Sequence, residues 1–281
     1  MEQTQAAVAA ALAEARAHGL RGEGRVVRDL TNVLIHLEPA RVIARVPLTL
    51  RRLRPPLWFA QEVELVQYLA DQGAPVAPPA ATLDPGPHER DGFLVSFWDY
   101  VAHDPDRADP PAVGQALERL HAALEHYRGS LPTYDRLAEV GELLGVLQPS
   151  ELVTQDELDG LRAVQRTLAG ATPSVGRPLH GDAHFGNVLW TSDGPLWNDF
   201  ENACTGPVEY DLACLAWRAA PGTLEALAAY GSYDARKVTQ VTPNLALFLA
   251  AWTIVVVTRA PTEGGIAEAR RRVRRALAHR P

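Results

Sequence analysis

Oxygen-bearing side chains suited to metal binding and proton transfer lie close together between residues 180 and 200 of this chain. Asp182 and Asn187 belong to the glycine-flanked stretch HGDAHFGN, and Asp199 follows in the stretch NDFE. Carboxylate and amide oxygens are the ligands that Mg²⁺ prefers, and a neighbouring carboxylate can accept the proton of a hydroxyl group. Phosphoryl transfer requires little more than such a base and a metal ion, so this set predicts that chemistry.

A β-hairpin is expected to bring these side chains together. The turn-forming letters TSDGP separate two apolar runs, VLW and LW, so the turn should centre near Asp193. Asn187 and Asp199 lie symmetrically about that centre, and antiparallel pairing would put their Cβ atoms about 5 Å apart. Asp182 lies just before the hairpin and can reach the same end. We therefore expect a magnesium site with a potential base beside it.

A zinc site is the alternative interpretation of the two histidines in HGDAH. Such a site needs about three protein ligands, and no second cluster of histidine or cysteine is seen in the sequence. The two cysteines, Cys204 and Cys214, are too few for a zinc cage or a disulfide framework. They are expected to be packing residues in a reducing cytoplasm. The zinc interpretation is therefore disfavoured.

The order His180-Gly-Asp182, then Asn187, then Asp199-Phe-Glu resembles the signature of the aminoglycoside phosphotransferase and choline-kinase-like family. The fold of that family is the fold of protein kinases. The resemblance implies that Asp182 is the catalytic base and that Asn187 and Asp199 are the metal ligands. It also implies supporting roles for His180, which would hold the loop by hydrogen bonds, and for Asp211, which would anchor the loop backbone.

The N-terminal half resembles the same family at lower specificity. VIARV resembles the strand that normally carries a phosphate-binding lysine, and that position is Arg45; QEVELVQYLADQGAPV resembles the helix whose glutamate, here Glu62, pairs with it. Arginine can still clamp phosphate, because the role is cationic. A solvated salt bridge between the two side chains is the alternative.

The nucleotide-binding loop departs from the family pattern, because RVVRDLTNVLI contains no glycine. Thr31 and Asn32 are expected to supply backbone and side-chain donors to the phosphates there. By the same resemblance, the base of the nucleotide would lie at the connection between two lobes, around Phe97 and Trp98.

Hydrophobic periodicity predicts the elements that would position these residues. GRVVRD, NVLIHLEPARVIARV and DGFLVSFW suggest an antiparallel sheet, in which EPA joins two strands as a hairpin. Helices are expected to end at Gly19 and at Gly73, and helices dominate after the Asp- and Pro-rich stretch DYVAHDPDRADPP. The expected fold is α+β and two-lobed, like that of protein kinases: a nucleotide-binding sheet lobe at 1–98 and a larger, mostly helical catalytic and substrate-binding lobe at 99–281.

Three features of the sequence have ordinary structural interpretations. His121 lies beside the apolar stripe of AVGQALERLHAALEHY and is expected to be a histidine at the edge of the core. The run Leu245–Val257 is shorter than the roughly 20 residues that span a bilayer, so a buried helix is expected. The arginines of LRRLRPP and of the C-terminal ARRRVRRALAHR are expected to be exposed.

Composition and charge restrict the partners. Hydrophobic residues make up 47% and charged residues 22% of the chain, as in globular proteins. The net charge of −7 disfavours nucleic acid and favours cationic or metal-bound partners. The N-terminal stretch lacks the basic start of a signal peptide, so a cytoplasmic protein without a membrane partner is expected.

The sequence therefore predicts a phosphotransferase with an alcohol group as acceptor. Mg²⁺ would be its cofactor and ATP or GTP its co-substrate, and the acceptor would be a small cationic molecule, such as an aminoglycoside antibiotic or an amine-bearing metabolite. Glu201 and Glu209 are expected to attract that acceptor. Protein acceptors are disfavoured, because GPVEYDLA leaves no room for an activation loop. The alternatives are a homoserine, choline or sugar kinase, and a catalytically silent nucleotide-binding protein, which the intact Asp/Asn/Asp set disfavours.

Overall fold

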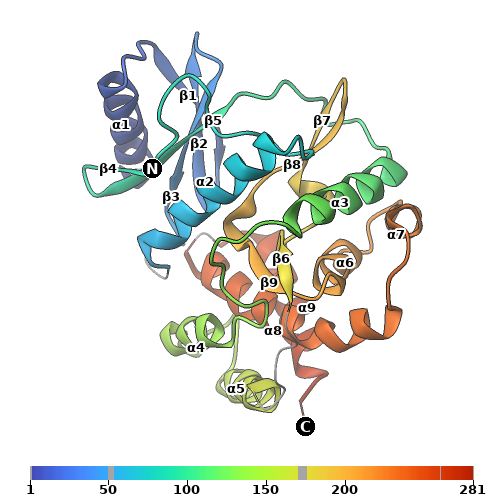
Figure 1. Ribbon diagram of the computed structural model, residues 1–281. Helices are drawn as coiled ribbons and strands as arrows, with labels where there is room; N and C mark the ends of the chain where they lie inside the picture. The colour runs from blue at the N-terminus through green and yellow to red at the C-terminus, as the bar shows by residue number, and fades with distance from the viewer. Residues whose placement is uncertain (1, 50–53, 170–175, 260, 281) are drawn as a thin grey trace.

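The computed structural model describes residues 2–49, 54–169, 176–259 and 261–280 (Figure 1). A sheet dominates the N-terminal part, and helices dominate the rest of the chain. The sheet has five antiparallel strands in the order β1-β2-β3-β5-β4. Its strands are β1 (Glu23–Asp29), β2 (Asn32–Glu38), β3 (Val42–Pro47), β4 (His88–Arg90) and β5 (Phe93–Asp99). The predicted antiparallel sheet is thus present.

The helix α1 (Glu2–Ala17) covers one face of this sheet (Figure 1). It packs through alanines, including Ala7, Ala11 and Ala15, against strand residues such as Ile35 and Phe97. The helix α2 (Pro56–Asp71) packs instead through Leu65, Val66 and Leu69 into a core shared with the helical part. Both helices are followed by the predicted glycines, Gly19 and Gly73, whose positive φ angles of 82° and 69° turn the chain out of the helix.

Two small two-stranded sheets lie among the helices. One pairs β6 (Arg177–Leu179) with β9 (Cys204–Gly206), and the other is the predicted hairpin of β7 (Val188–Thr191) and β8 (Gly194–Trp197). The 3₁₀ turns η2 (Phe185–Asn187) and η3 (Phe200–Asn202) flank the hairpin. The backbone of Trp197 exchanges hydrogen bonds with the segment after α2, accepting from Ala77 and donating to Pro75. The hairpin therefore adjoins the sheet part.

The helical part is organised around its longest helix. Its helices are α3 (Pro110–Leu124), α4 (Leu137–Val146), α5 (Gln155–Ala169), α6 (Glu209–Trp217), α7 (Thr223–Tyr230), α8 (Ala235–Arg259) and α9 (Glu263–Leu277). By length and composition α8 could cross a membrane, but 67% of its most apolar window is buried inside the protein, as in the core helix of a soluble protein. The run Leu245–Val257 lies in α8 and is a buried core segment, as predicted.

Candidate active site

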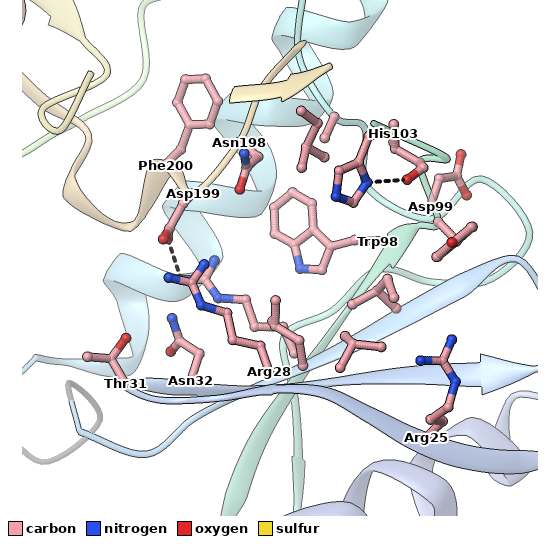
Figure 2. Close-up of a pocket in the computed structure, with 18 residues that line it drawn as sticks. Arg25, Arg28, Thr31, Asn32, Trp98, Asp99, His103, Asn198, Asp199 and Phe200 are labelled. Carbon is pink, nitrogen blue, oxygen red and sulfur yellow. Dashed lines mark hydrogen bonds and ion pairs between the residues drawn. The ribbon is translucent and has the colours of Figure 1, made fainter. Parts of the chain in front are cut away.

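A cavity of about 290 Å³ lies between the sheet and the hairpin (Figure 2). Figure 2 shows Arg28, Thr31 and Asn32 on the side of the sheet, Asp199 on the opposite side and Trp98 between them. Most of its remaining lining comes from β1, from the end of β5 and the chain after it, and from the hairpin and the residue that follows it: Arg25, Val27, Asp99, Tyr100, Val101, His103, Leu189 and Asn198. The cavity volume is just below the roughly 300–1,000 Å³ typical of ligand pockets.

The hairpin is present, but its register differs from the predicted one. Val188 pairs with Trp197, and the backbone of Asn198 donates to the carbonyl of Asn187. Asn198, and not Asp199, therefore lies opposite Asn187. The reason is that the turn consists of Ser192 and Asp193 and so centres between them, half a residue before the predicted centre.

Asp199 leaves the line of β8 through its own backbone conformation. Its φ of 67° lies in the left-handed region, which is uncommon outside glycine. The side chain that follows the strand is thereby redirected, and its carboxylate meets the guanidinium of Arg45 at 3.2 Å. Such strained positions persist where the surrounding structure holds them, and they cluster at functional sites.

Asp182 and Asn187 are in direct contact. The amide nitrogen Nδ2 of Asn187 donates to the carbonyl oxygen of Asp182 at 3.0 Å and to its Oδ2 at 3.3 Å. Because Nδ2 is used in this way, Oδ1 of Asn187 is left as the atom that can bind a metal ion. The two predicted residues thus lie at the same end of the hairpin.

His184 supports Asp182, a contact that the sequence interpretation missed. Its Nδ1 accepts a hydrogen bond from the backbone N–H of Gly186, so the proton of a neutral ring lies on Nε2, which faces Oδ2 of Asp182 at 3.6 Å. Burial raises the pKa of Asp182, but the neighbouring His184 and His180 outweigh it and hold the pKa below its ordinary value. Asp182 is therefore ionised at neutral pH, as a base must be.

Arg45 is the centre of a buried ionic cluster. Its Nη1 donates to Glu62 at 2.5 Å, and its Nη2 contacts both Asp199 and Glu201. The predicted contact with Glu62 is present, and with both side chains less than 10% exposed it is not a solvated salt bridge. Three carboxylates share this one guanidinium.

Among the described residues, the ionic cluster around Arg45 has three carboxyl groups and only this one guanidinium to balance them. Burial and the charge of Glu201 raise the pKa of Asp199 to about 8, although Arg45 opposes this shift. A carboxyl group in such surroundings gains a cation readily, because a divalent ion removes the repulsion among its neighbours. The carboxylate of Asp199 therefore suits a hard cation such as Mg²⁺. The second predicted ligand, Asn187, lies at the end of the same hairpin but does not line the cavity.

Asp211 holds the loop that precedes Asp182. Its fully buried carboxylate accepts from the backbone N–H groups of His180 and Gly181 at 2.9 and 2.8 Å. It also contacts Nε2 of His121, whose Nδ1 lies 2.8 Å from the hydroxyl of Tyr230. The anchoring position proposed for Asp211 is thus observed. His121 is more than a core-edge histidine, because both of its ring nitrogens are used.

His180 is held by the hairpin. Its Nε2 lies 3.1 Å from the carbonyl oxygen of Asn198, and its ring lies against Phe200 with the centroids 4.3 Å apart. Burial lowers the pKa of His180, so the ring is neutral at pH 7. These contacts agree with the supporting role expected from the sequence.

The residues predicted to contact the nucleotide do not all line the cavity. Thr31, Asn32 and Trp98 line the cavity, whereas Phe97 does not. Successive residues of a strand point to opposite faces, and Phe97 of β5 lies fully buried in the core under α1. The prediction that Phe97 contacts the nucleotide is therefore wrong.

Neither glutamate predicted to attract the acceptor faces solvent. Glu201 accepts a hydrogen bond from Asn32 at 2.8 Å and belongs to the ionic cluster around Arg45. Glu209 is buried at the start of α6 and does not line the cavity. The prediction is corrected for both side chains: the chain between Asp199 and α6 turns inward, which the acidic composition did not reveal.

Arg54 is also buried, although the run LRRLRPP was expected to be exposed; Leu50–Leu53 lie outside the described residues. Its guanidinium donates to Glu139 of α4 at 2.7 Å and to the backbone oxygen of Glu201 at 2.6 Å. A further bond of 2.7 Å reaches Oδ1 of Asn202. Arg54 thereby fixes the segment that follows Asp199.

Comparison with known proteins places these features in a wider group. Residues 25–248 match the model of the family described as "Phosphotransferase enzyme family". Stress response kinase A of Escherichia coli K12 is 30% identical over 179 residues, which cover 57% of this chain and 53% of that protein. A protein of Salmonella typhimurium named "Serine/threonine protein kinase RdoA" is 28% identical over 174 residues, with the same shares covered. The chain spans about half the length of the curated relatives it matches.

Solved structures resemble the fold over nearly the whole chain. A structure described as amicoumacin kinase in complex with AMP-PNP, Ca²⁺ and Ami gives a TM-score of 0.72 at 16% identity and covers 100% of this chain and 96% of its own. The choline kinase LicA of Streptococcus pneumoniae gives 0.67 at 13% identity, covering 95% and 97%. Likeness at this identity concerns the fold, and it confirms the predicted two-lobed α+β architecture.

Proposed function

Because the chain belongs to the phosphotransferase enzyme family, we propose that it is a kinase that transfers the γ-phosphate of ATP or GTP to a hydroxyl group of a small, cationic acceptor. The observation that carries this proposal is the meeting of Asp182 and Asn187 at one end of the hairpin that also presents Asp199 to the cavity. Phosphoryl transfer is mostly a matter of such positioning and of charge stabilisation.

Asp182 would act as the base. Its pKa lies below the ordinary value, so the carboxylate is ready to accept the proton of an acceptor hydroxyl as the oxygen attacks the γ-phosphorus. The contact from Asn187 and the nearby ring of His184 hold that carboxylate in place.

Asn187 and Asp199 would hold the metal ion. When bound, Mg²⁺ would neutralise charge on the phosphate oxygens as the bond to the leaving group breaks. The ATP analogue and Ca²⁺ in the amicoumacin kinase complex support a nucleotide with a divalent cation in this fold. Arg45 and Glu62 would then keep Asp199 in position from the side of the sheet.

The phosphates require a further cation, because Arg45 is engaged by three carboxylates. Arg25 also lines the cavity, but it is paired with Glu38. Arg28 lines the cavity from β1 and has no ion pair among the described residues. We assign Arg28 the contact with the nucleotide phosphates, with Thr31 and Asn32 beside it, and Trp98 the contact with the base.

The small, cationic nature of the acceptor is supported by two observations. The net charge of −7 attracts cations. Two structures of the same fold are named for kinases of amine-bearing compounds, choline and aminopropanol. An antibiotic acceptor, and with it a role in antibiotic resistance, is supported by the amicoumacin and kanamycin complexes.

A protein hydroxyl is the second candidate acceptor, because one relative is named a serine/threonine protein kinase. Against it stands the short path from Asp199 to α6. That path consists of the turn η3, the strand β9 and a few further residues. It offers no long exposed segment of the kind that organises a peptide substrate in protein kinases.

A phosphorylation screen tests the proposal. Hydroxylated amines, sugars and aminoglycosides would be incubated with the protein, Mg²⁺ and either ATP or GTP, and each acceptor read by mass spectrometry for one added phosphoryl group. Transfer to an amine-bearing acceptor that is absent in Asp182→Asn supports the proposal. Transfer only to a protein such as casein would favour the second candidate, and nucleotide binding without any transfer would favour a catalytically silent protein.

A further inference from the structure

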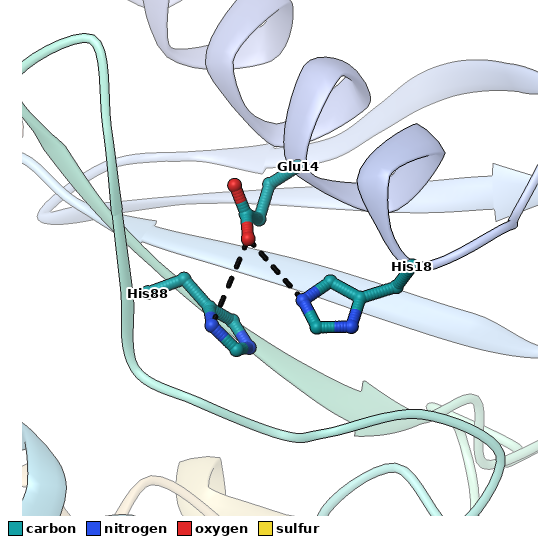
Figure 3. Close-up of side chains that lie close together, drawn as sticks. All are labelled: Glu14, His18 and His88. Atoms are coloured by element: carbon teal, nitrogen blue, oxygen red, sulfur yellow. Dashed lines mark hydrogen bonds and ion pairs between the residues drawn. The ribbon is translucent and has the colours of Figure 1, made fainter.

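A cluster of two histidines and a glutamate lies between α1 and β4, on the face of the sheet that packs against α1, and none of its residues lines the cavity (Figure 3). Glu14 and His18 come from α1 and the residue that follows its last turn, and His88 is the first residue of β4. Figure 3 shows both imidazole rings directed at the same oxygen of Glu14. His88 is distant in the sequence from Glu14 and His18, and none of the three residues takes part in the proposed phosphoryl transfer.

The three possible ligand atoms have the spacing of a metal site. Oε1 of Glu14 lies 3.2 Å from Nε2 of His18 and 3.7 Å from Nδ1 of His88, and all three atoms lie within 4.8 Å of one another. A tetrahedral ion with bonds of about 2.0–2.1 Å holds its ligand atoms about 3.3 Å apart. Only small rotations of the side chains would therefore be needed to close the site.

The surrounding groups orient these ligands. Nε2 of His88 lies 3.0 Å from the carbonyl oxygen of Asp84, so a proton on Nε2 would leave Nδ1 as the free, metal-binding atom. Arg90 donates to Oε2 of Glu14 at 2.6 Å, which fixes the carboxylate and leaves Oε1 for the histidines. Such second contacts to ligating histidines and carboxylates are the usual support of a metal site.

We propose that Glu14, His18 and His88 form a binding site for Zn²⁺ that fastens α1 to β4. Two imidazoles and one carboxylate suit zinc, whereas Mg²⁺ and Ca²⁺ prefer oxygen ligands alone. The fourth position is taken by water, because the side chains of His18 and His88 retain 25% and 17% of their exposure. The site is independent of the proposed kinase function.

A bound ion would strengthen the attachment of α1 to the sheet. The buried face of this helix consists of alanines, together with Glu14, and each alanine buries little apolar area. The histidine rings also touch Phe97, with centroid distances of 6.0 Å for His18 and 5.9 Å for His88. A bound ion would thus link the helix, the strand β4 and the core of the sheet.

Zinc binding is tested on the whole 281-residue chain after treatment with a chelator. The protein is titrated with Zn²⁺ in a calorimeter in the presence of excess Mg²⁺, which occupies the oxygen-rich phosphate site. The expected result is one equivalent of Zn²⁺ that is bound by the parent and lost in His18→Gln and His88→Gln. The melting temperature of the parent should rise with Zn²⁺, and this rise should be absent in both variants.

His126→Gln is the matched control, because His126 is an exposed histidine outside the cluster. It should bind zinc like the parent. Visible absorption of the parent loaded with Co²⁺ adds a measurement that needs no variant, since a tetrahedral site with two imidazoles gives intense bands. No zinc-dependent change in the parent, or equal zinc binding by the parent and a folded His88→Gln, would overturn the proposal.

Discussion

At the scale of single residues, the proposed role of Asp182 as the base depends on its protonation state. We expect Asp182→Asn to retain nucleotide affinity, because the amide keeps the shape of the side chain. Turnover should fall by about 10²–10⁴-fold, the typical contribution of a general base. Steady-state kinetics and nucleotide titration measure the two quantities separately. Equal turnover in variant and parent would remove Asp182 from the role of base.

The two proposed metal ligands should contribute unequally to Mg²⁺ binding, because one is charged and the other is neutral. Asp199→Ala is expected to weaken Mg²⁺-dependent nucleotide binding by about 100-fold or more, since even the loss of outer contacts of a metal site costs about 10–100-fold. Asn187→Ala should weaken it less. Calorimetric titration with nucleotide, with and without Mg²⁺, gives the comparison. The same Mg²⁺ dependence in parent and variants would contradict the site.

Arg45 and Glu62 should act as a unit. Arg45→Ala leaves three carboxylates without their shared cation, so the nucleotide KM should rise and kcat should fall. Glu62→Ala should have a milder effect, and the double variant should be no worse than Arg45→Ala alone. A double-mutant cycle on kcat/KM measures the coupling. Strictly additive losses would show that the pair is not functionally coupled.

Predictability from the sequence differs among these residues for a physical reason. Asp182, Asn187 and Asp199 share one short stretch, so local spacing was enough to group them. Glu201 is just as near, yet it turns inward to Arg45, because the direction of a side chain after a strand depends on one backbone angle at Asp199. No local spacing could group His18 with His88.

At the scale of elements, periodicity predicted the long strands of the sheet, the hairpin and the helices α1, α2 and α3, but it did not single out α4–α7 or the short strands β4, β6 and β9. β4 has only three residues, two of them charged, and so carries no apolar alternation. The hairpin was found, but a shift of half a residue in its turn moved the residue opposite Asn187 from Asp199 to Asn198. On β5, successive side chains point to opposite faces of the sheet, so Trp98 lines the cavity and Phe97 lies in the core.

The helix α9 offers a test of element stability against pH. Glu268 accepts hydrogen bonds from Arg271 and Arg272, and Arg272 also donates to Thr253 of α8 at 2.8 Å. The bonds from Arg271 and then Arg272 lower the pKa of Glu268 to about 2, although burial opposes this. A lowered carboxyl pKa stabilises the folded state above the ordinary value of 4.5, and the contribution is lost as pH falls toward about 2.

We therefore expect Glu268→Gln to lower the free energy of unfolding at pH 7 by less than about 1 kcal/mol, because Glu268 is partly exposed and solvent screens its ion pairs. The difference from the parent should shrink between pH 4.5 and about 2. Urea unfolding at several pH values measures it. Glu142→Gln, at an exposed glutamate of α4 without an ion pair among the described residues, is the control. A difference independent of pH would assign the effect to packing.

At the scale of the whole molecule, buried charges join the sheet part to the helical part. Asn32 and Arg45 of the sheet contact Glu201 beyond the hairpin, and Arg54 contacts Glu139 of α4. Arg136 donates to the same Glu139 at 3.0 Å. The local sequence, such as the stretch RVVRDLTNVLI that contains Asn32, could not reveal these contacts. Each contact links segments that only the fold brings together. Buried ionic contacts therefore hold the sheet side of the cavity against the hairpin side.

Glu139 is the best place to test this junction. Burial favours its neutral form, but the charges of Arg54 and Arg136 outweigh that cost and hold its pKa below the ordinary value. Glu139→Gln keeps the shape and leaves two buried arginines without their counterion, so the free energy of unfolding should fall by about 3–5 kcal/mol. Nucleotide binding should weaken as well, because Arg54 holds the backbone of Glu201, close to Asp199. Urea unfolding and nucleotide titration measure the two effects, with Glu142→Gln on the same helix as the control, which should change stability by less than about 0.5 kcal/mol. If Glu139→Gln unfolds at the same urea concentration as the parent, the two parts of the molecule are held together by their apolar contacts, and the buried ion network contributes no net stability.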